Sequence, residues 1–96
     1  MRARNKQWKL SLYIAGNTPK SNNAIINIKA CAEEHLKGSY SMEIIDVLFD
    51  PELAMENQIL AIPTLIKSGP GPFKRIVGDF TNKAKVLKGL GIENPS

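Results

Sequence analysis

The side chains that most often carry nucleophilic or acid–base chemistry are scarce in this chain: it has one cysteine, Cys31, and one histidine, His35. A single cysteine excludes an internal disulfide, a Cys-x-x-Cys redox pair and a cysteine-based zinc site. A single histidine excludes the usual multi-histidine metal sites. Cys31 falls within a helical pattern near its apolar stripe, where a cysteine is expected to pack as a small hydrophobe. We therefore expect no catalytic residue, no metal ligand set and no cofactor.

The elements that position these residues begin with a strand over residues 9–15. Leu10, Leu12 and Ile14 alternate with polar neighbours, which predicts one buried face. Thr18 and Pro19 then predict the start of a helix, because threonine caps a helix and proline suits its first position. The helix is expected to run to about residue 36, with a buried stripe made of Ile25, Ile28, Ala32 and Leu36.

The next segment, residues 40–48, is apolar on both faces and predicts a central strand. Its helical connection from the first strand predicts that the two strands are parallel. Asp50 and Pro51 repeat the pattern of a cap followed by proline. They predict a short helix to about residue 57 that turns Leu53 and Ala54 inward.

The remaining pattern predicts a hairpin and a last helix. Residues 64–67 and 73–78 are expected to be strands, because four turn-forming residues, 69–72, separate them. The last helix is expected to be capped by Thr81, to end at two glycines, and to bury one side. The inward residues would be Ala84, Leu87 and Leu90, and the ending glycines Gly89 and Gly91.

The predicted order, β-α-β-α-β-β-α, is an α/β fold of the thioredoxin-like type, in a single domain over residues 1–96 with loose termini at 1–8 and 92–96. Thioredoxin-like enzymes carry their reactive thiols in the loop after the first strand, where the helix dipole lowers the thiol pKa. Here that loop contains Asn17 and Thr18 but no thiol. Pro63 precedes a strand, where such proteins place a cis proline, and we interpret it as a structural turn.

The formal net charge of +4 is spread along the chain, and aromatic residues make up only 6% of it. A nucleic-acid interface normally has a denser basic stripe with interleaved aromatics, so we expect no nucleic-acid partner. No apolar run approaches the length of about 20 residues that spans a bilayer. The basic start lacks the continuous apolar stretch of a signal peptide, and we expect a cytoplasmic protein with no membrane partner.

Several blocks of the sequence together resemble one family. Residues 12–21 read LYIAGNTPKS, residues 44–48 read IIDVL, and residues 50–54 read DPELA. The match continues in QILAIPTL at 58–65, KRIVGDF at 74–80 and KVLKGL at 85–90. These blocks resemble the KaiB family of the cyanobacterial circadian clock, and the resemblance covers about residues 8–91.

The resemblance implies a non-enzymatic regulator that docks on KaiC, a hexameric ATPase, in circadian timing or in stress adaptation. It also implies two possible arrangements of the segment from about residue 51, one thioredoxin-like and one that self-associates as a dimer or tetramer. The segment containing Glu52, Glu56 and Gln58 would belong to the docking surface. KaiA is a doubtful partner, because Ser41 and Glu43 stand where clock members usually have alanine and lysine.

Two other functions stay open beside this one. The first is a glutathione-linked thioredoxin-fold enzyme that would use Asn17, Thr18 and the Pro63 turn. The second is a self-assembling stress protein without an ATPase partner. Retention of the protein on glutathione-agarose would support the first alternative. The absence of a KaiC homologue from the genomic neighbourhood would support the second.

Overall fold

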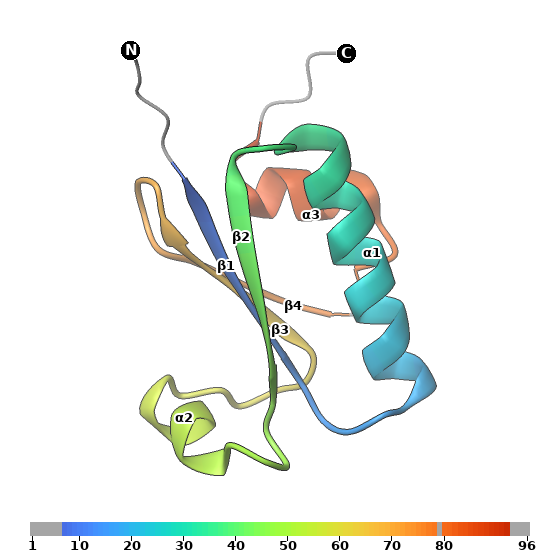
Figure 1. Ribbon diagram of the computed structural model, residues 1–96, viewed down its shortest axis with the longest axis vertical. Helices are drawn as coiled ribbons and strands as arrows, with labels where there is room; N and C mark the ends of the chain where they lie inside the picture. The colour runs from blue at the N-terminus through green and yellow to red at the C-terminus, as the bar shows by residue number, and fades with distance from the viewer. Residues whose placement is uncertain (1–6, 79, 93–96) are drawn as a thin grey trace.

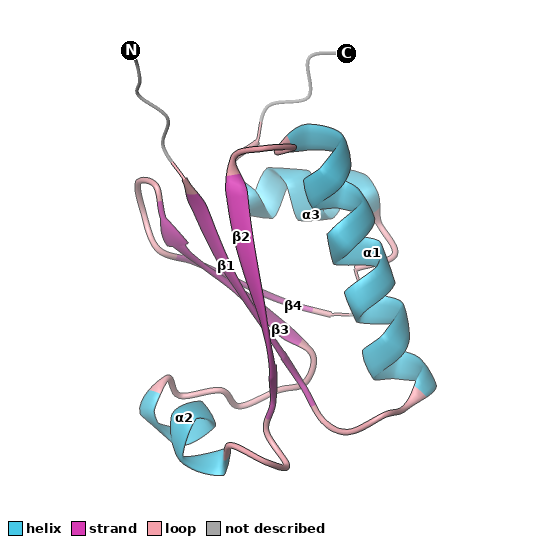
Figure 2. Cartoon of the chain, in the orientation of Figure 1, coloured by secondary structure: helices cyan, strands magenta, loops and turns pink. Residues whose placement is uncertain are grey.

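A computed structural model describes residues 7–78 and 80–92 of the chain. Four strands form one sheet, and three helices flank it (Figures 1 and 2). The observed order of elements matches the predicted α/β, thioredoxin-like order. In chain order the elements are β1 (Trp8–Ile14), α1 (Pro19–His35), β2 (Tyr40–Asp46), α2 (Pro51–Glu56), β3 (Thr64–Gly69), β4 (Lys74–Val77) and α3 (Lys83–Leu90).

The strand order in the sheet is β2-β1-β3-β4, so β1 and β3 are central. The β1 strand pairs in parallel with β2 and antiparallel with β3, and β3 and β4 form an antiparallel hairpin. The prediction that residues 40–48 form a central strand was wrong, because β2 lies at an edge. Its apolar residues face both ways for another reason: Met42 packs against the core under α1, and Ile45 belongs to the core under α2.

The two faces of the sheet bury separate cores. As Figure 1 shows, α1 and α3 cover one face, and the alternation of β1 sends Leu10, Leu12 and Ile14 into that core. The smaller core lies under α2 and contains Tyr13, Ile45, Ala54 and Ile66. Of the predicted stripe, Ile28 and Ala32 of α1 are buried, Leu36 is buried directly after the helix as its C-cap, and Ile25 is partly buried.

Helix α1 begins where the sequence predicts. The Oγ1 atom of Thr18 accepts a hydrogen bond of 3.1 Å from the backbone N–H of Ser21, and Pro19 is the first helical residue. Asp50 precedes α2 in the same way, but its side chain makes no capping hydrogen bond. The predicted position of α2 is therefore confirmed, but the predicted capping hydrogen bond to the side chain of Asp50 is absent.

The predicted details of α3 need three corrections. Asn82, rather than Thr81, caps the helix, since its Oδ1 accepts a bond of 3.1 Å from the N–H of Lys85. The buried face of α3 is made of Val86, Leu87 and Leu90, so Val86 replaces Ala84 as an inward residue and Ala84 is exposed. Gly89 lies inside the helix and does not end it. A Cβ atom there would stand 2.9 Å from Cδ1 of Ile76, which explains a glycine at this close approach.

The other glycine does what the pattern predicts. Gly91 has a left-handed φ of 81° and ends α3. Two residues expected in loose termini are structured: Trp8 begins β1, and Ile92 packs against the main core. Gln7 is exposed and belongs to no helix or strand, and residues 1–6 and 93–96 of the expected termini lie outside the described residues. None of the described helices is long and apolar enough to cross a membrane.

Candidate interaction surface

Cys31 lies on α1 and is 5% exposed, within the core that α1 and α3 enclose. Burial raises the pKa of its thiol, because the thiolate is the charged form and burial disfavours charge. A reactive cysteine needs the opposite shift and solvent access. The structure therefore agrees with the expectation that Cys31 packs rather than reacts.

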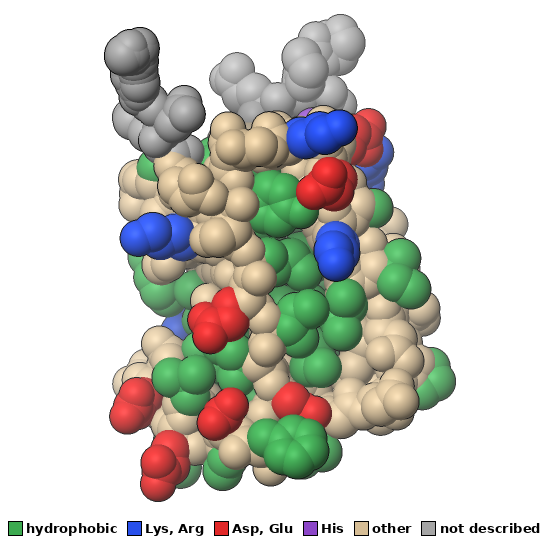
Figure 3. Space-filling model, in the orientation of Figure 1, with side chains coloured by type: hydrophobic (Ala, Val, Ile, Leu, Met, Phe, Trp, Pro, Cys, Tyr) green, Lys and Arg blue, Asp and Glu red, His purple; other side chains and the backbone are tan. Residues whose placement is uncertain are grey.

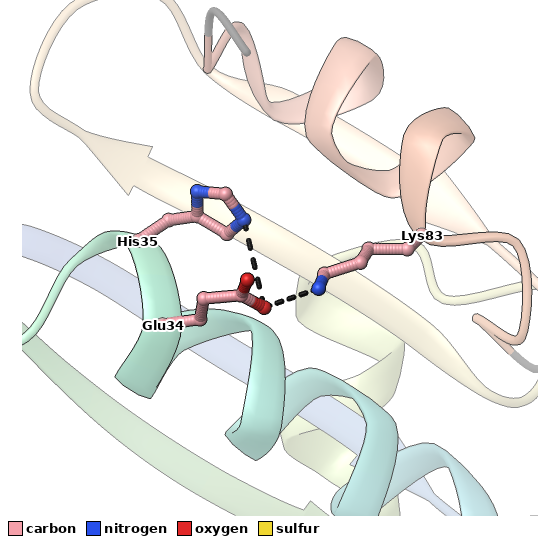
Figure 4. Close-up of polar contacts among 3 residues, drawn as sticks. All are labelled: Glu34, His35 and Lys83. Carbon is pink, nitrogen blue, oxygen red and sulfur yellow. Dashed lines mark ion pairs between the residues drawn. The ribbon is translucent and has the colours of Figure 1, made fainter. Parts of the chain in front are cut away.

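His35 belongs to a small polar cluster at the end of α1 (Figure 4). Its Nε2 atom is 3.8 Å from Oε1 of Glu34, and the same carboxylate forms an ion pair with Lys83 of α3. A hydrogen bond from Lys83 is the main reason that the pKa of Glu34 is lowered. The ion pair connects α1 to α3 at an exposed position, so we interpret it as a structural contact. Among the described residues, no group of three or more His, Cys, Asp or Glu side chains could hold a metal.

The loop that would serve a glutathione-linked enzyme uses its polar groups internally. Asn17 Oδ1 accepts a hydrogen bond of 2.8 Å from Asn22, and Thr18 caps α1. Pro63 follows a cis peptide bond and is buried before β3, where its carbonyl accepts a bond of 3.2 Å from the N–H of Gly78. These contacts stabilise the local backbone. The side chains of Asn17 and Thr18 both form hydrogen bonds within the protein.

The most exposed apolar side chains of the described residues gather around α2. We define the α2-end surface as four hydrophobic residues together with the carboxylates Glu52 and Glu56. The four are Leu48, Phe49, Met55 and Leu60, with exposed fractions of 67%, 82%, 76% and 94%. Figure 3 shows hydrophobic and acidic side chains side by side at this end of the molecule. Exposed apolar patches of this kind mark sites of protein association.

Asp46 at the end of β2 positions the start of this surface. Its Oδ1 atom accepts hydrogen bonds of 3.0 Å from the backbone N–H groups of Gly16 and Leu48. Gly16 has a φ of 71°, and a Cβ atom there would lie 3.1 Å from Cδ1 of Leu48. The carboxylate thus joins the loop before α1 to the turn before α2, and the turn directs Phe49 to the surface.

Arg75 on β4 holds the other end of α2. Its guanidinium donates a bond of 2.7 Å to the carbonyl oxygen of Gln58 and one of 3.0 Å to that of Asn57. Gln58 has a φ of 55°, which is unusual for a residue other than glycine. The two bonds fix the path of the chain from α2 toward Leu60.

The residues singled out from the sequence divide into two groups. Glu52 and Glu56 lie exposed on α2, and Gln58 is exposed just after it. Burial is the largest cause of a raised pKa at Tyr13, and Glu43 and then Glu56 contribute to the same shift while Arg75 opposes it. Glu43 of β2 and Glu56 of α2 thus both act on the same tyrosine.

Ser41 lies apart from this group. It pairs with Lys9, whereas Ile45, four residues further along the strand, pairs with Tyr13 beside α2. Four residues of strand span about 13 Å. Ser41 and Glu43 are both exposed on an edge strand, and Glu43 is the nearer of the two along β2 to the Ile45 position.

Sequence reasoning missed the exposed hydrophobic residues and the two polar residues that hold them. One signal was present: Leu48 and Phe49 are consecutive apolar residues directly before Asp50 and Pro51, in the segment that connects a strand to a helix, and connecting segments run over the protein surface. No local signal identifies Arg75, because its bonds reach residues 17 and 18 positions earlier in the chain.

Comparison with known proteins identifies the family of the chain. The family model described as the KaiB domain matches residues 11–92. The chain belongs to the KaiB family. It is 48% identical over 90 residues to the circadian clock oscillator protein KaiB of Prochlorococcus marinus, covering 94% of this chain and 83% of that protein. It is also 48% identical over 87 residues to KaiB of Thermostichus vulcanus, covering 91% of this chain and 81% of the relative.

Solved structures support the fold of this KaiB-family chain. The N-terminal domain of SasA from Synechococcus elongatus superposes with a TM-score of 0.75 at 19% identity, covering all of this chain and 94% of that one. Mitochondrial thioredoxin 3 of Saccharomyces cerevisiae superposes with a TM-score of 0.70 at 18% identity, covering 91% of this chain and 77% of that one. The fold is thus thioredoxin-like, as the order of elements predicts.

Proposed function

We propose that the chain is a non-enzymatic regulator that docks on a KaiC-type hexameric ATPase through its α2-end surface. The observation that carries the proposal is the exposure of Phe49 and Leu60, at 82% and 94%, beside two exposed carboxylates. Membership of the KaiB family supports the class of partner, because its named relatives are circadian clock oscillator proteins.

Physical chemistry favours an interface at this position. Burying a large apolar side chain on association contributes about 1.5–3 kcal/mol, so Phe49 and Leu60 are suited to anchor a complex. The surrounding carboxylates would set the orientation of the partner and the rate of encounter rather than most of the affinity. Asp46 accepts a hydrogen bond from the N–H of Leu48, and Arg75 donates one to the carbonyl oxygen of Gln58. These bonds hold both ends of the segment, which reduces the ordering cost of binding.

The test is a titration of the labelled chain with a purified KaiC homologue, in the presence of ATP, followed by fluorescence anisotropy. Phe49→Ser and Leu60→Ser should each weaken binding by at least about tenfold, since loss of an anchor commonly costs more than 1 kcal/mol. Ile26→Ser is the matched control, because Ile26 is 63% exposed on α1, away from the α2-end surface.

The outcome separates the partner from the surface. Binding by the unmodified chain that Phe49→Ser and Leu60→Ser leave unchanged would contradict docking through α2. Absence of binding by the unmodified chain, at micromolar concentrations of both proteins, would contradict the ATPase partner. The stress protein without an ATPase partner would then be the better explanation.

KaiA is not proposed as a partner. Glu43 places negative charge on the exposed edge strand, at a position where the family resemblance implies a lysine in clock members. A charge reversal at an interface makes recognition of the same partner unfavourable. Self-association as a dimer or tetramer belongs to the proposal through the second arrangement of the segment from about residue 51, which the family resemblance implies.

A further inference from the structure

A buried lysine lies at the opposite end of the sheet from α2. Lys67 of β3 is only 4% exposed, and its Nζ atom donates a bond of 2.8 Å to the carbonyl oxygen of Pro70. The same atom lies 4.8 Å from the centroid of the Trp8 ring. Burial, and secondarily the charge of Lys74, lowers the pKa of Lys67.

The charge of Lys67 lacks the partner that a buried amine usually has. Buried lysines are normally paired with a carboxylate. In the described part of the chain, the ion pairs join Glu34 to His35 and to Lys83, and neither includes Lys67. An ammonium group carries three N–H donors, and the carbonyl of Pro70 uses one of them.

An open cavity of about 420 Å³ adjoins this lysine, larger than the cavity of about 230 Å³ beside Cys31. Lys67 and Lys74 contribute two positive charges to its lining, and no acidic side chain of the described residues lines it. Trp8, Pro72 and Leu90 supply apolar surface. The cavity therefore combines a cationic part with an apolar part.

We propose that this cavity binds a small amphipathic anion, with its acidic head at Lys67 and Lys74 and its apolar body against Trp8. A carboxylate or phosphate head would accept hydrogen bonds from the two ammonium groups and reduce the repulsion between them. A ligand of this class fits the mixed lining better than a neutral molecule or a simple inorganic ion.

The site is separate from the α2-end surface. Figure 1 shows the turn between β3 and β4 at one end of the sheet and α2 at the other. Binding at Lys67 can therefore be measured without the ATPase partner, and its result does not depend on docking through α2.

Trp8 is the only tryptophan of the chain, so its fluorescence reports on the cavity. The experiment titrates the full chain with octanoate at low ionic strength. Two control ligands are titrated in the same way: acetate, which has the carboxylate but not the long alkyl chain, and octan-1-ol, which has the alkyl chain but no charge. We expect a saturable change of Trp8 fluorescence with octanoate, and binding weaker by at least about tenfold with either comparator, which is 1.4 kcal/mol or more. Added salt should weaken the octanoate complex.

Three variants decide whether the lysines are responsible. Lys74→Glu reverses the charge of a partly exposed side chain. Lys67→Met replaces the buried lysine by an uncharged, unbranched side chain of similar length. Both should weaken octanoate binding by at least about tenfold, while Lys29→Glu, an equal change of charge on the exposed side of α1, should not.

Circular dichroism of each variant verifies folding. If Lys67→Met fails to fold, Lys74→Glu still tests the proposal, because Lys74 is partly exposed. Three results would overturn the proposal: equal binding of octan-1-ol and octanoate, a response to octanoate that does not saturate, or unchanged affinity in folded Lys74→Glu.

Discussion

The guanidinium of Arg75 donates a hydrogen bond of 2.7 Å to the carbonyl oxygen of Gln58, so a strand at the edge of the sheet restrains the backbone that leaves α2. Gln58 has a left-handed backbone conformation, with φ at 55°. A charged donor that binds two successive carbonyl groups stabilises this turn more than a single neutral hydrogen bond would.

Replacing Arg75 by methionine should destabilise the chain by about 1–3 kcal/mol, because two carbonyl groups lose a charged donor. Amide hydrogen exchange should increase in residues 56–60 more than in β1. Arg75→Lys is the control, since lysine keeps the charge but cannot bond both carbonyls with one planar group. Equal stability of all three proteins in urea denaturation would show that the contact contributes nothing.

Gln58→Gly should be neutral or stabilising by up to about 1 kcal/mol, because glycine adopts a positive φ without steric cost. Gln58→Val should destabilise by about 1–2 kcal/mol, since a β-branched residue is strained in that conformation. Thermal and urea denaturation measure both. The reverse order of stability would show that the conformation at residue 58 is not left-handed in solution.

Cys31→Ala should be less stable than the unmodified chain at neutral pH, by about 1 kcal/mol, because a buried sulfur is lost. Burial raises the pKa of the thiol, so the folded state keeps this proton at pH values where the unfolded chain has released it. The unfolded state then binds fewer protons, and the free energy of unfolding falls as pH rises above the ordinary thiol pKa of about 8.5.

The alanine variant lacks this loss, so the stability difference between the two proteins should shrink between about pH 8 and pH 10. Urea denaturation of both proteins across that range measures it. A constant difference would argue against a protonated, buried thiol. A faster reaction of the folded chain than of the unfolded chain with a thiol reagent would count against it as well.

Reversing charge at both Glu52 and Glu56 to lysine should weaken docking to a KaiC homologue by about 1–3 kcal/mol if the carboxylates are desolvated in the complex. Folding should survive, because exposed substitutions usually change stability by no more than about 0.5 kcal/mol. Circular dichroism and the anisotropy titration measure the two effects. Unchanged affinity in a folded double variant would place the carboxylates outside the interface, where they only complement the dipole of α2.

Light scattering at micromolar concentration should give the mass of a dimer or tetramer. The reason is the second arrangement of the segment from about residue 51, which the family resemblance implies to be the self-associating one. A strictly monomeric mass for the unmodified chain at this concentration would remove self-association from the proposed function.

The sequence predicts elements well where its patterns are local. Alternation at Leu10 and Leu12, the pair Thr18 and Pro19, and the Gly-Pro turn at 69–72 each depend on neighbours within a few positions, and the structure contains the corresponding elements. The cap of α3 was misplaced by one residue, because Thr81 and Asn82 are both suitable capping residues and only tertiary packing distinguishes them.

Long-range features were beyond local patterns. The apolar sequence of β2 is compatible with a central strand and with an edge strand. Its edge position follows only from the pairing of β3 with β1, which is not visible in the local sequence. The candidate surface was found in part. Helical spacing indicates that Glu52 and Glu56 are exposed, but the contacts of Arg75 with residues 57 and 58 arise from the fold.

The two outer strands of the sheet have a consequence for solubility. An open strand edge presents backbone donors and acceptors that can recruit further strands into fibrous aggregates. Glu43 is exposed on β2, and Arg75 is exposed on β4, so each open edge carries a charged side chain. Charge on an edge strand disfavours such uncontrolled pairing. In the described part of the chain, these charges thus act as gatekeepers against edge-to-edge pairing at both outer strands.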